Sequence, residues 1–281
     1  MKLQEELLSR LERECTKEEF QWLGKILSQG QRERKLGFVM SHRHISHKPT
    51  KAGTIQPDNV DYPIDLNQWT RDQLARTVIL LSLDNGNQTE FQETIELLFD
   101  TADNREAQAI YASIPFFNYA YSWKHRATEA IRSNVGLIFE AMAFNNSYPA
   151  MYFDDAAWNQ LVLKTIFNNK SIWNILGLEQ RRNQGLADTI SDFAHERWAA
   201  DRTLPSEVWF LVAPFPGEHF WQDTYHLLTS GVEANKEAGY LLWQTNASRT
   251  PENFTEAFRD LFESFSKKDL SWKSLTQNSS S

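Results

Sequence analysis

The stretch Asp192-Phe-Ala-His-Glu-Arg-Trp-Ala-Ala-Asp-Arg202 has the period of an α-helix, but its polar residues do not fall on one face. At about 100° per residue, Asp192 and His195 share a polar stripe, whereas Phe193 lies on the opposite, apolar arc. Arg197 points into the middle of that arc, where an unpaired guanidinium would be costly. The stretch therefore predicts a helix whose Arg197 meets a polar group of the protein or of a ligand.

Two other expected helices, 123–144 and 154–168, show the same anomaly. Asn134 lies at the centre of the apolar arc of the first helix, and Asn159 lies among apolar residues of the second. Because buried polar groups are nearly always hydrogen-bonded, we expect Asn134, Asn159 and Arg197 to meet one another or a common ligand. Either a polar brace between neighbouring helices or a ligand site would satisfy them.

The composition indicates a globular helical protein. Its 281 residues, 41% of them hydrophobic, can bury a large core, and the low count of 11 glycines disfavours an all-β fold. A net charge of −8 argues against nucleic acid as a partner. The sequence has no long apolar run, no signal peptide and a single cysteine, so we expect no direct membrane insertion and a cytoplasmic location.

Helical periodicity dominates the chain after a less regular beginning, and the expected helices include 88–101 and 179–202. Two helix pairs look alike, since each joins two helices by a short turn, which predicts an all-α fold of HEAT-like antiparallel repeats, an α-solenoid. The Thr16-Lys-Glu-Glu stretch predicts a capping box inside the first segment. In chain order we expect an N-terminal helical segment at 1–28, an extended loop or linker at 29–67, a helical repeat domain at 68–270 and a disordered tail at 271–281.

His195 is the candidate catalytic residue. It could act as a general acid or base tuned by Asp192 or Glu196, with Arg197 stabilising an anionic transition state. Arg197 lies about 160° from His195 around the helix, which counts against both acting on one small substrate.

Two Asp-x-x-His pairs suggest a second chemistry. Asp192 with His195 and Asp223 with His226 have the spacing of half of a di-iron carboxylate site, so a metal-dependent helical oxygenase is an alternative. The simpler interpretation is a solvated stripe with local Asp–His contacts.

A third group of histidines occurs in the expected loop, at His42, His44 and His47. They could supply metal ligands, but exposed loop histidines are the simpler interpretation. The glycine-rich signatures of nucleotide cofactor sites and the Gly-x-Ser-x-Gly elbow do not occur, so we expect no cofactor.

The region between Arg132 and Arg202 contains a series of distinctive motifs, namely Arg132-Ser-Asn134, Phe139-Glu-Ala141, Asn145-Asn-Ser-Tyr-Pro149, Trp158-Asn-Gln-Leu-Val-Leu-Lys164, Arg181-Arg-Asn183 and Asp192–Arg202. These motifs resemble those of the EboA family of bacterial metabolite traffic proteins. It implies a helical cytoplasmic protein that assists the synthesis, or the transport toward the cell envelope, of a small secondary metabolite such as a prenylated or cyclitol-type compound. The implied partners are that metabolite, pathway enzymes and a membrane prenyltransferase.

Together these observations favour an adaptor or ligand-binding protein over an enzyme. In this interpretation Arg181 and Arg197 bind an anionic group, while Asn134 and Asn159 orient it. Surplus tryptophan and phenylalanine side chains line the apolar remainder. The candidate ligand-binding residues are Asn134, Asn159, Lys164, Arg181 and Arg197.

Overall fold

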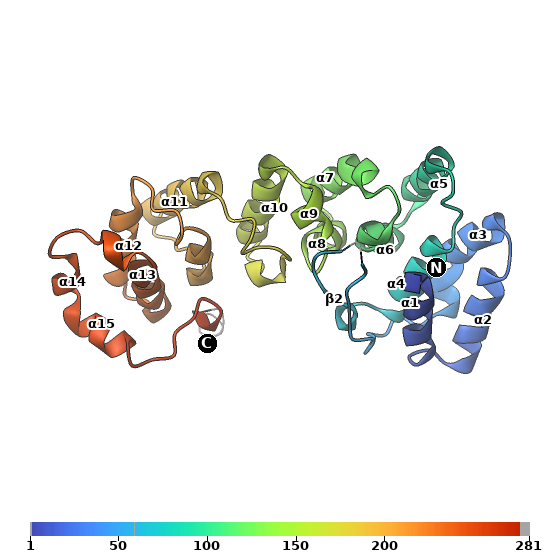
Figure 1. The fold of residues 1–281 in the computed structure, drawn as a ribbon, viewed down its shortest axis with the longest axis horizontal. Helices are drawn as coiled ribbons and strands as arrows, with labels where there is room; N and C mark the ends of the chain where they lie inside the picture. The colour runs from blue at the N-terminus through green and yellow to red at the C-terminus, as the bar shows by residue number, and fades with distance from the viewer. Residues whose placement is uncertain (1, 59, 276–281) are drawn as a thin grey trace. The chain divides into compact units, whose positions relative to one another are not determined.

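Figure 1 shows the fold in a computed structural model that describes residues 2–58 and 60–275. Helices dominate it, and the single two-stranded sheet is antiparallel, so the expected all-α class is confirmed. The chain divides into two compact units. The first unit extends to Ala157 and includes Asn174–Gly177, and the second contains Trp158–Trp173 and the chain from Leu178 onward. Among the described residues, no helix is both long and apolar enough to cross a membrane.

The regular elements follow one another along the chain as short helices with brief connections. The α-helices that begin in the first unit are α1 (Lys2–Glu12), α2 (Lys17–Leu27), α3 (Gln31–His44), α4 (Arg71–Leu81), α5 (Gln88–Thr101), α6 (Asn104–Ser113), α7 (Lys124–Arg132), α8 (Gly136–Ala143), α9 (Tyr148–Tyr152) and α10 (Asp155–Phe167). Those of the second unit are α11 (Gln184–Ala199), α12 (Phe220–Leu228), α13 (Glu233–Thr245), α14 (Phe254–Ala257) and α15 (Arg259–Phe265). The strands are β1 (Thr54–Ile55) and β2 (Ile64–Asp65), and the 3₁₀-helices are η1 (Leu66–Gln68), η2 (Ile114–Phe116), η3 (Ala120–Trp123), η4 (Ile172–Asn174), η5 (Ser206–Leu211) and η6 (Ala247–Arg249).

Helix α4 forms the centre of the first unit. It is buried from Asp72 to Leu80 and packs against α1, α3 and α6, although it carries polar side chains as well as apolar ones. One of these polar groups is satisfied inside the core, because the Thr77 hydroxyl lies 2.8 Å from the Ser113 hydroxyl on α6. The core of this unit is therefore built around one helix that contacts neighbours on several sides.

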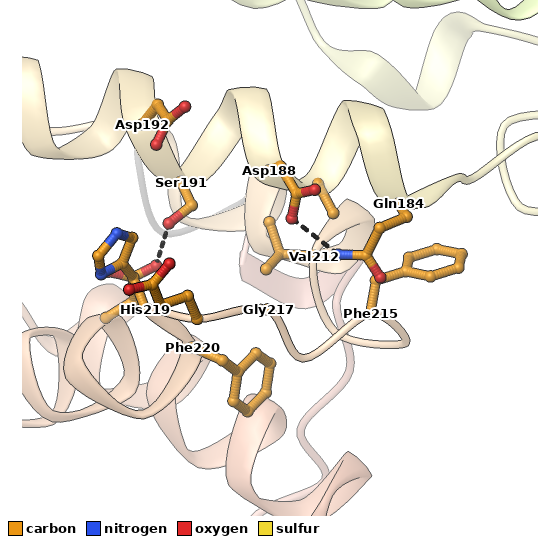
Figure 2. Close-up of a pocket in the computed structure, with 12 residues that line it drawn as sticks. Gln184, Asp188, Ser191, Asp192, Val212, Phe215, Gly217, His219 and Phe220 are labelled. Atoms are coloured by element: carbon orange, nitrogen blue, oxygen red, sulfur yellow. Dashed lines mark hydrogen bonds between the residues drawn. The ribbon is translucent and has the colours of Figure 1, made fainter.

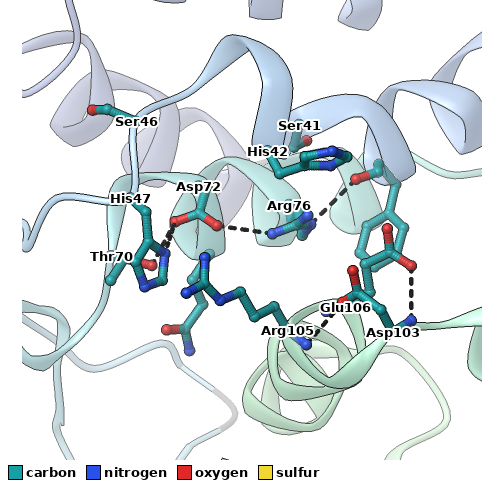
Figure 3. Close-up of polar contacts among 12 residues, drawn as sticks. Ser41, His42, Ser46, His47, Thr70, Asp72, Arg76, Asp103, Arg105 and Glu106 are labelled. Atoms are coloured by element: carbon teal, nitrogen blue, oxygen red, sulfur yellow. Dashed lines mark hydrogen bonds and ion pairs between the residues drawn. The ribbon is translucent and has the colours of Figure 1, made fainter.

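Two ionised side chains of α4 form a buried pair (Figure 3). Arg76 Nη1 donates to Asp72 Oδ2 at 2.9 Å, and the two side chains are only 1% and 2% exposed. The other oxygen of Asp72 accepts from Thr70 Oγ1 at 2.7 Å and lies 2.9 Å from His47 Nδ1. Arg76 Nε donates to the carbonyl of Phe38 on α3, so this pair ties α4 to the neighbouring helix.

The expectation of an extended loop over 29–67 is wrong for its first part, where α3 forms instead. The sequence of α3 shows little apolar periodicity, because α3 contacts its neighbour at a small residue and not along a stripe of large apolar residues. A Cβ atom at Gly37 would lie 2.4 Å from Ile26 Cγ2 on α2, so the two helices approach closely at this point. The pattern of large apolar residues therefore gave no sign of this helix.

The three histidines of this segment do not gather around a common point. His42 and His44 lie on α3 rather than in a loop, and His44 stacks on Trp22 with ring centroids 4.6 Å apart. His42 contacts the backbone carbonyl of Val39, and His47 contacts Asp72. Each therefore has its own local contact.

The expected capping box at Thr16 is confirmed. Thr16 Oγ1 accepts from the Glu19 N–H, and the Glu19 carboxylate accepts from the Thr16 N–H at 2.8 Å. The second Glu19 oxygen accepts from the backbone N–H of Ser46 at 2.7 Å, beyond the end of α3. Glu19 therefore ties the start of α2 to the chain that follows α3.

Replacing Glu19 by glutamine is expected to cost about 1–3 kcal/mol, because an amide NH2 would then face a backbone donor. Burial opposes ionisation, but the bonds from Thr16 and Ser46 outweigh it and lower the Glu19 pKa. The stabilisation is thus present above the unfolded pKa of about 4.3 and is lost as pH falls through the lowered folded pKa. Urea unfolding at a series of pH values across this range measures the contribution of Glu19 to stability. The Glu18→Gln variant of an exposed neighbour is the control, and an equal pH dependence in Glu19→Gln and wild type would contradict this role.

The end of the described chain packs onto the second unit. Leu275 is buried, and Trp272 lies against Phe210 with ring centroids 6.3 Å apart. The expected disordered tail at 271–281 is therefore wrong for 271–275, because these apolar side chains have partners. Residues 276–281 lie outside the described residues.

Candidate functional site

The helix expected at 179–202 is shorter than its apolar period suggests. It begins at Gln184 because the side-chain oxygen of Asn183 accepts from the Leu186 N–H at 2.9 Å, an N-cap. It ends at Ala199. This helix, α11, contains the candidate residues Asp192, His195, Glu196 and Arg197.

Asn159 and Asn183 join α10 to the start of α11. Their side-chain amides form a reciprocal pair, with Asn159 Nδ2 donating at 3.2 Å and Asn183 Nδ2 donating at 2.9 Å. This is the polar brace that the sequence offered as one alternative, but the partner of Asn159 is another asparagine. The amide of Asn159 is occupied by this contact.

Asn134 does not take part in any such contact. The helix expected at 123–144 is broken between α7 and α8, where Ser133 Oγ accepts from the Val135 N–H at 3.1 Å. Asn134 lies at this bend and is exposed. Its predicted burial is wrong because the helical wheel assumed one continuous helix.

Arg197 also has a local partner. Its Nε donates to the Thr203 carbonyl at 2.9 Å, and its guanidinium lies 5.6 Å from the centre of the Phe193 ring. The side chain is half-buried rather than fully buried, so it reaches the backbone just beyond its own helix. The predicted cluster of Asn134, Asn159 and Arg197 is therefore not formed.

The two other candidate cations lie on the second unit. The Arg181 guanidinium sits over the ring of the fully buried Trp158, 5.0 Å from its centre. Lys164 is half-buried on α10, and burial lowers its pKa. Arg181 thus covers an aromatic side chain of the core.

His195 has a carboxylate partner on the next helix rather than on its own. His195 Nε2 lies 2.5 Å from Asp223 Oδ1, and Ser191 Oγ donates to Asp223 Oδ2 at 2.6 Å. Asp223 is on α12 and is completely buried, whereas the His195 side chain is 30% exposed. Desolvation raises the Asp223 pKa, although the bonds from Ser191 and His195 and the nearby His219 oppose that rise. Asp223 is therefore a buried acceptor held by two side chains of α11.

The expected partners of His195 lie elsewhere. Asp192 and Glu196 are exposed, and neither pairs with His195. His226 stacks on Trp198 with ring centroids 3.8 Å apart, so it does not join Asp223 at a common centre. Within 2–58 and 60–275, no group of three or more histidine, cysteine or acidic side chains is arranged to hold a metal ion. The two Asp-x-x-His pairs are thus not assembled into a dinuclear site.

A cavity of about 310 Å³ lies beside Asp223 within the second unit (Figure 2). One wall comes from α11, and the facing wall comes from the chain between η5 and the first turns of α12. Ser191 and Asp223 meet at this cavity, and Gln184 donates to Asp188 Oδ1 at 2.7 Å along its rim. The lining residues are Gln184, Ala187, Asp188, Ser191, Asp192, Val212, Phe215, Gly217, Glu218, His219, Phe220 and Asp223.

The lining has an acidic part and an apolar part. Its four carboxylates belong to Asp188, Asp192, Glu218 and Asp223, and none of its residues is lysine or arginine. Val212, Phe215 and Phe220 supply apolar surface. Because carboxylates only accept hydrogen bonds, the acidic part suits hydroxyl or ammonium groups. The five candidate ligand-binding residues predicted from the sequence do not line this cavity.

Only part of this arrangement was predictable from the sequence. His195, Asp192 and Asp223 were candidates, but their expected pairs lay within single helices rather than across α11 and α12. The polar face of Gln184, Asp188 and Asp192 is visible in the sequence as a stripe at helical spacing. Nothing in the sequence showed that the Pro214–Gly217 turn would fold over that stripe and close a cavity. An Asp–His pair beside a cavity also fits a general base, but Arg197, assigned to the transition state, lies outside the lining.

Comparison with known proteins identifies the family. A family model described as metabolite traffic protein EboA matches residues 3–213, which includes the whole first unit up to Ala157 apart from its first residues and all of α11. The match ends before α12, so Asp223 lies beyond it. No curated protein and no solved structure matches the chain significantly. Since the matched region covers well over half of the sequence, the chain belongs to the EboA family of metabolite traffic proteins.

Proposed function

We propose that this protein binds a small metabolite in the cavity between α11 and α12 and carries it between the enzymes of a pathway. The observation that supports this proposal is the cavity itself, whose lining combines four carboxylates with apolar side chains. The family name indicates a role in metabolite traffic, and a carrier needs a site that binds without requiring chemistry. We place this role in the cytoplasm and favour a ligand-binding adaptor over an enzyme.

The negative charge of the cavity indicates which polar head group the ligand carries. Asp188, Asp192 and Glu218 are exposed at the rim, while Asp223 is buried beneath them. Carboxylates gathered without a compensating cation create a negative local potential. A ligand head that carries several hydroxyl groups, or an ammonium group, provides the donors that such a site requires.

The apolar side chains and the volume of the cavity indicate the rest of the ligand. A cavity of about 310 Å³ lies at the lower end of the range for small-molecule sites, roughly 300–1,000 Å³. Phe215 and Val212 give contact surface for a hydrocarbon part, whose burial stabilises the complex. A cyclitol-type head with a prenyl chain has both features, and its transport toward the envelope would involve a membrane prenyltransferase as a partner.

We also propose that the helices are arranged as the HEAT-like repeats expected from the sequence. Helices α12 and α13 are joined by residues 229–232 and pack closely along their length, as in a helical hairpin. A Cβ atom at Gly239 would lie 2.9 Å from Leu228 Cγ, so this hairpin is tightly packed. Such a hairpin holds the α12 wall of the cavity in a fixed position, which suits a preformed binding site.

Calorimetric titration with two amphiphilic probes tests the proposal. Octyl glucoside and octylammonium chloride, each below its micellar concentration, present hydroxyl and ammonium donors on the same apolar tail. At least one should bind the wild-type protein with a dissociation constant of about 1 mM or tighter, and the stronger of the two identifies the head group. The double variant Asp188→Asn, Asp192→Asn should weaken that binding at least tenfold, about 1.4 kcal/mol.

The control is Asp269→Asn, which removes one exposed carboxylate of the second unit outside the cavity lining. It should bind the probe as the wild type does. The absence of binding by both probes, or equal binding by the double variant and wild type, would reject the cavity as the ligand site.

A further inference from the structure

A second cavity, separate from the one above, lies within the first unit. It has a volume of about 140 Å³ and is formed by α4, α6 and α8 together with the residues that precede α4 and follow α8. Helix α6 packs against both α4 and α8, so the three helices hold its walls together. The lining residues are Gln68, Trp69, Gln73, Gln108, Ala112, Glu140, Ala141, Phe144 and Asn145.

Gln73 contributes to this cavity an amide that has no partner within the described chain. Its side chain as a whole is only 8% exposed, and the described residues give its amide no hydrogen bond. The amide is not among the fully buried polar groups of the structure, so its donors and acceptor open into the cavity and are free to bind a ligand. The amides of Gln68 and Gln108, which line the same cavity, likewise have no partner among residues 2–58 and 60–275. Three glutamine side chains without a partner among the described residues therefore line this cavity, together with the Glu140 carboxylate.

Asn145 shows by contrast what a structural amide does in the same wall. Its Nδ2 donates to the Asp65 carbonyl at 2.7 Å, and its Oδ1 accepts from the Asp65 N–H at 2.8 Å. Its backbone has a positive φ of 49°, a conformation in which asparagine is favoured over most residues. Asn145 thus fixes the wall to β2, whereas the three glutamines remain available.

We propose that this cavity binds one small, neutral ring polyol. A hydroxyl group both donates and accepts, as a primary amide does, so glutamine side chains match a ring that carries several hydroxyls. Trp69, which is 5% exposed, and Phe144 provide the aromatic surface that contacts the C–H face of such a ring.

This inference does not rest on the α11–α12 cavity. The two sites lie in different units, and their linings differ, since four carboxylates dominate the polar part of one, whereas the other has four amides and a single carboxylate. All the residues of the amide-lined cavity fall inside the part of the chain that the family model matches.

Titration of the full-length, ¹⁵N-labelled protein with myo-inositol tests the proposal, because the NH2 pairs of glutamine side chains are visible by NMR. The Gln73 and Gln108 pairs are assigned by their loss in Gln73→Leu and Gln108→Leu. Both should shift in a saturable manner in the wild type, and each variant should weaken binding at least tenfold. Gln108 is only half-buried, so its variant serves if Gln73→Leu does not fold.

Gln92→Leu on α5 is the matched control, since it makes the same change outside the cavity lining. Its affinity for myo-inositol should equal that of the wild type, as should that of the double variant Asp188→Asn, Asp192→Asn. The absence of saturable shifts in the folded wild type would show that the cavity holds water only. Unchanged binding by both glutamine variants would also overturn the proposal.

Discussion

Replacing Asp72 by alanine is expected to destabilise the protein by about 3–5 kcal/mol, the usual cost of breaking a buried ion pair from one side. The Arg76 guanidinium is 1% exposed and would keep only the Phe38 carbonyl and the face of the Phe38 ring as partners. Its Nη2 already has no hydrogen-bond partner among the described residues. Urea unfolding followed by tryptophan fluorescence measures the loss, with separate transitions fitted where the two units unfold independently.

The surface pair of Arg126 and Asp100 provides the matched control. Its atoms lie 2.8 Å apart, but the Asp100 side chain is 66% exposed, so Asp100→Ala should cost less than about 1 kcal/mol. The double variant Asp72→Leu, Arg76→Met removes both buried charges and should recover most of the stability. A cost below about 1 kcal/mol for Asp72→Ala alone would contradict the structural role of this pair.

Replacing Asp223 by alanine should cost about 2–3 kcal/mol, because the buried Ser191 hydroxyl would lose its acceptor. His195 loses its partner too, but its side chain is partly exposed and can bind water. Asp223→Asn keeps an acceptor for Ser191 and should cost less. Thermal or urea unfolding compares the stability of the wild type, Asp223→Ala and Asp223→Asn. The control is Asp192→Ala on the exposed face of α11, whose stability should lie within about 0.5 kcal/mol of that of the wild type.

The pH dependence of the free energy of unfolding distinguishes the wild type from Asp223→Asn. Burial raises the folded pKa of Asp223, so its contribution to stability is fully present below the unfolded pKa of about 3.9. That contribution is lost as pH rises through the higher folded pKa. Asp223→Asn cannot ionise, so the stability of the wild type relative to this variant should fall as pH increases above about 4. If the stability of the wild type relative to Asp223→Asn instead rose over this pH range, the pairing with His195 would have a larger effect on the Asp223 pKa than desolvation has.

Local sequence signals predicted the helices well where the helices are regular. The helix expected at 88–101 coincides with α5, and the capping box at Thr16 forms as its spacing predicts. Both depend on interactions between residues a few positions apart, which a sequence shows directly. The family resemblance, which rested on motifs from Arg132 to Arg202, is confirmed by a match over residues 3–213.

The site was harder to predict because its contacts join separate elements. Wheel arithmetic placed Arg197 and Asn134 in a core, but Arg197 reaches the Thr203 carbonyl after its helix ends and Asn134 lies at a helix break. His195 was recognised, yet its partner Asp223 lies 28 residues away on α12. The buried pair of Asp72 and Arg76 does have a local signal, opposite charges four residues apart within one helix, that could have revealed it.

We propose above all that this protein carries a small molecule in the α11–α12 cavity. Native mass spectrometry of the protein purified from its own cells tests it most directly, because a retained ligand adds its mass and can be released and identified. We expect a bound molecule with several hydroxyls or an amine on an apolar part, lost in the double variant Asp188→Asn, Asp192→Asn and retained in Asp269→Asn. A wild-type mass equal to that of the bare chain, or a ligand kept by the double variant, would contradict the account.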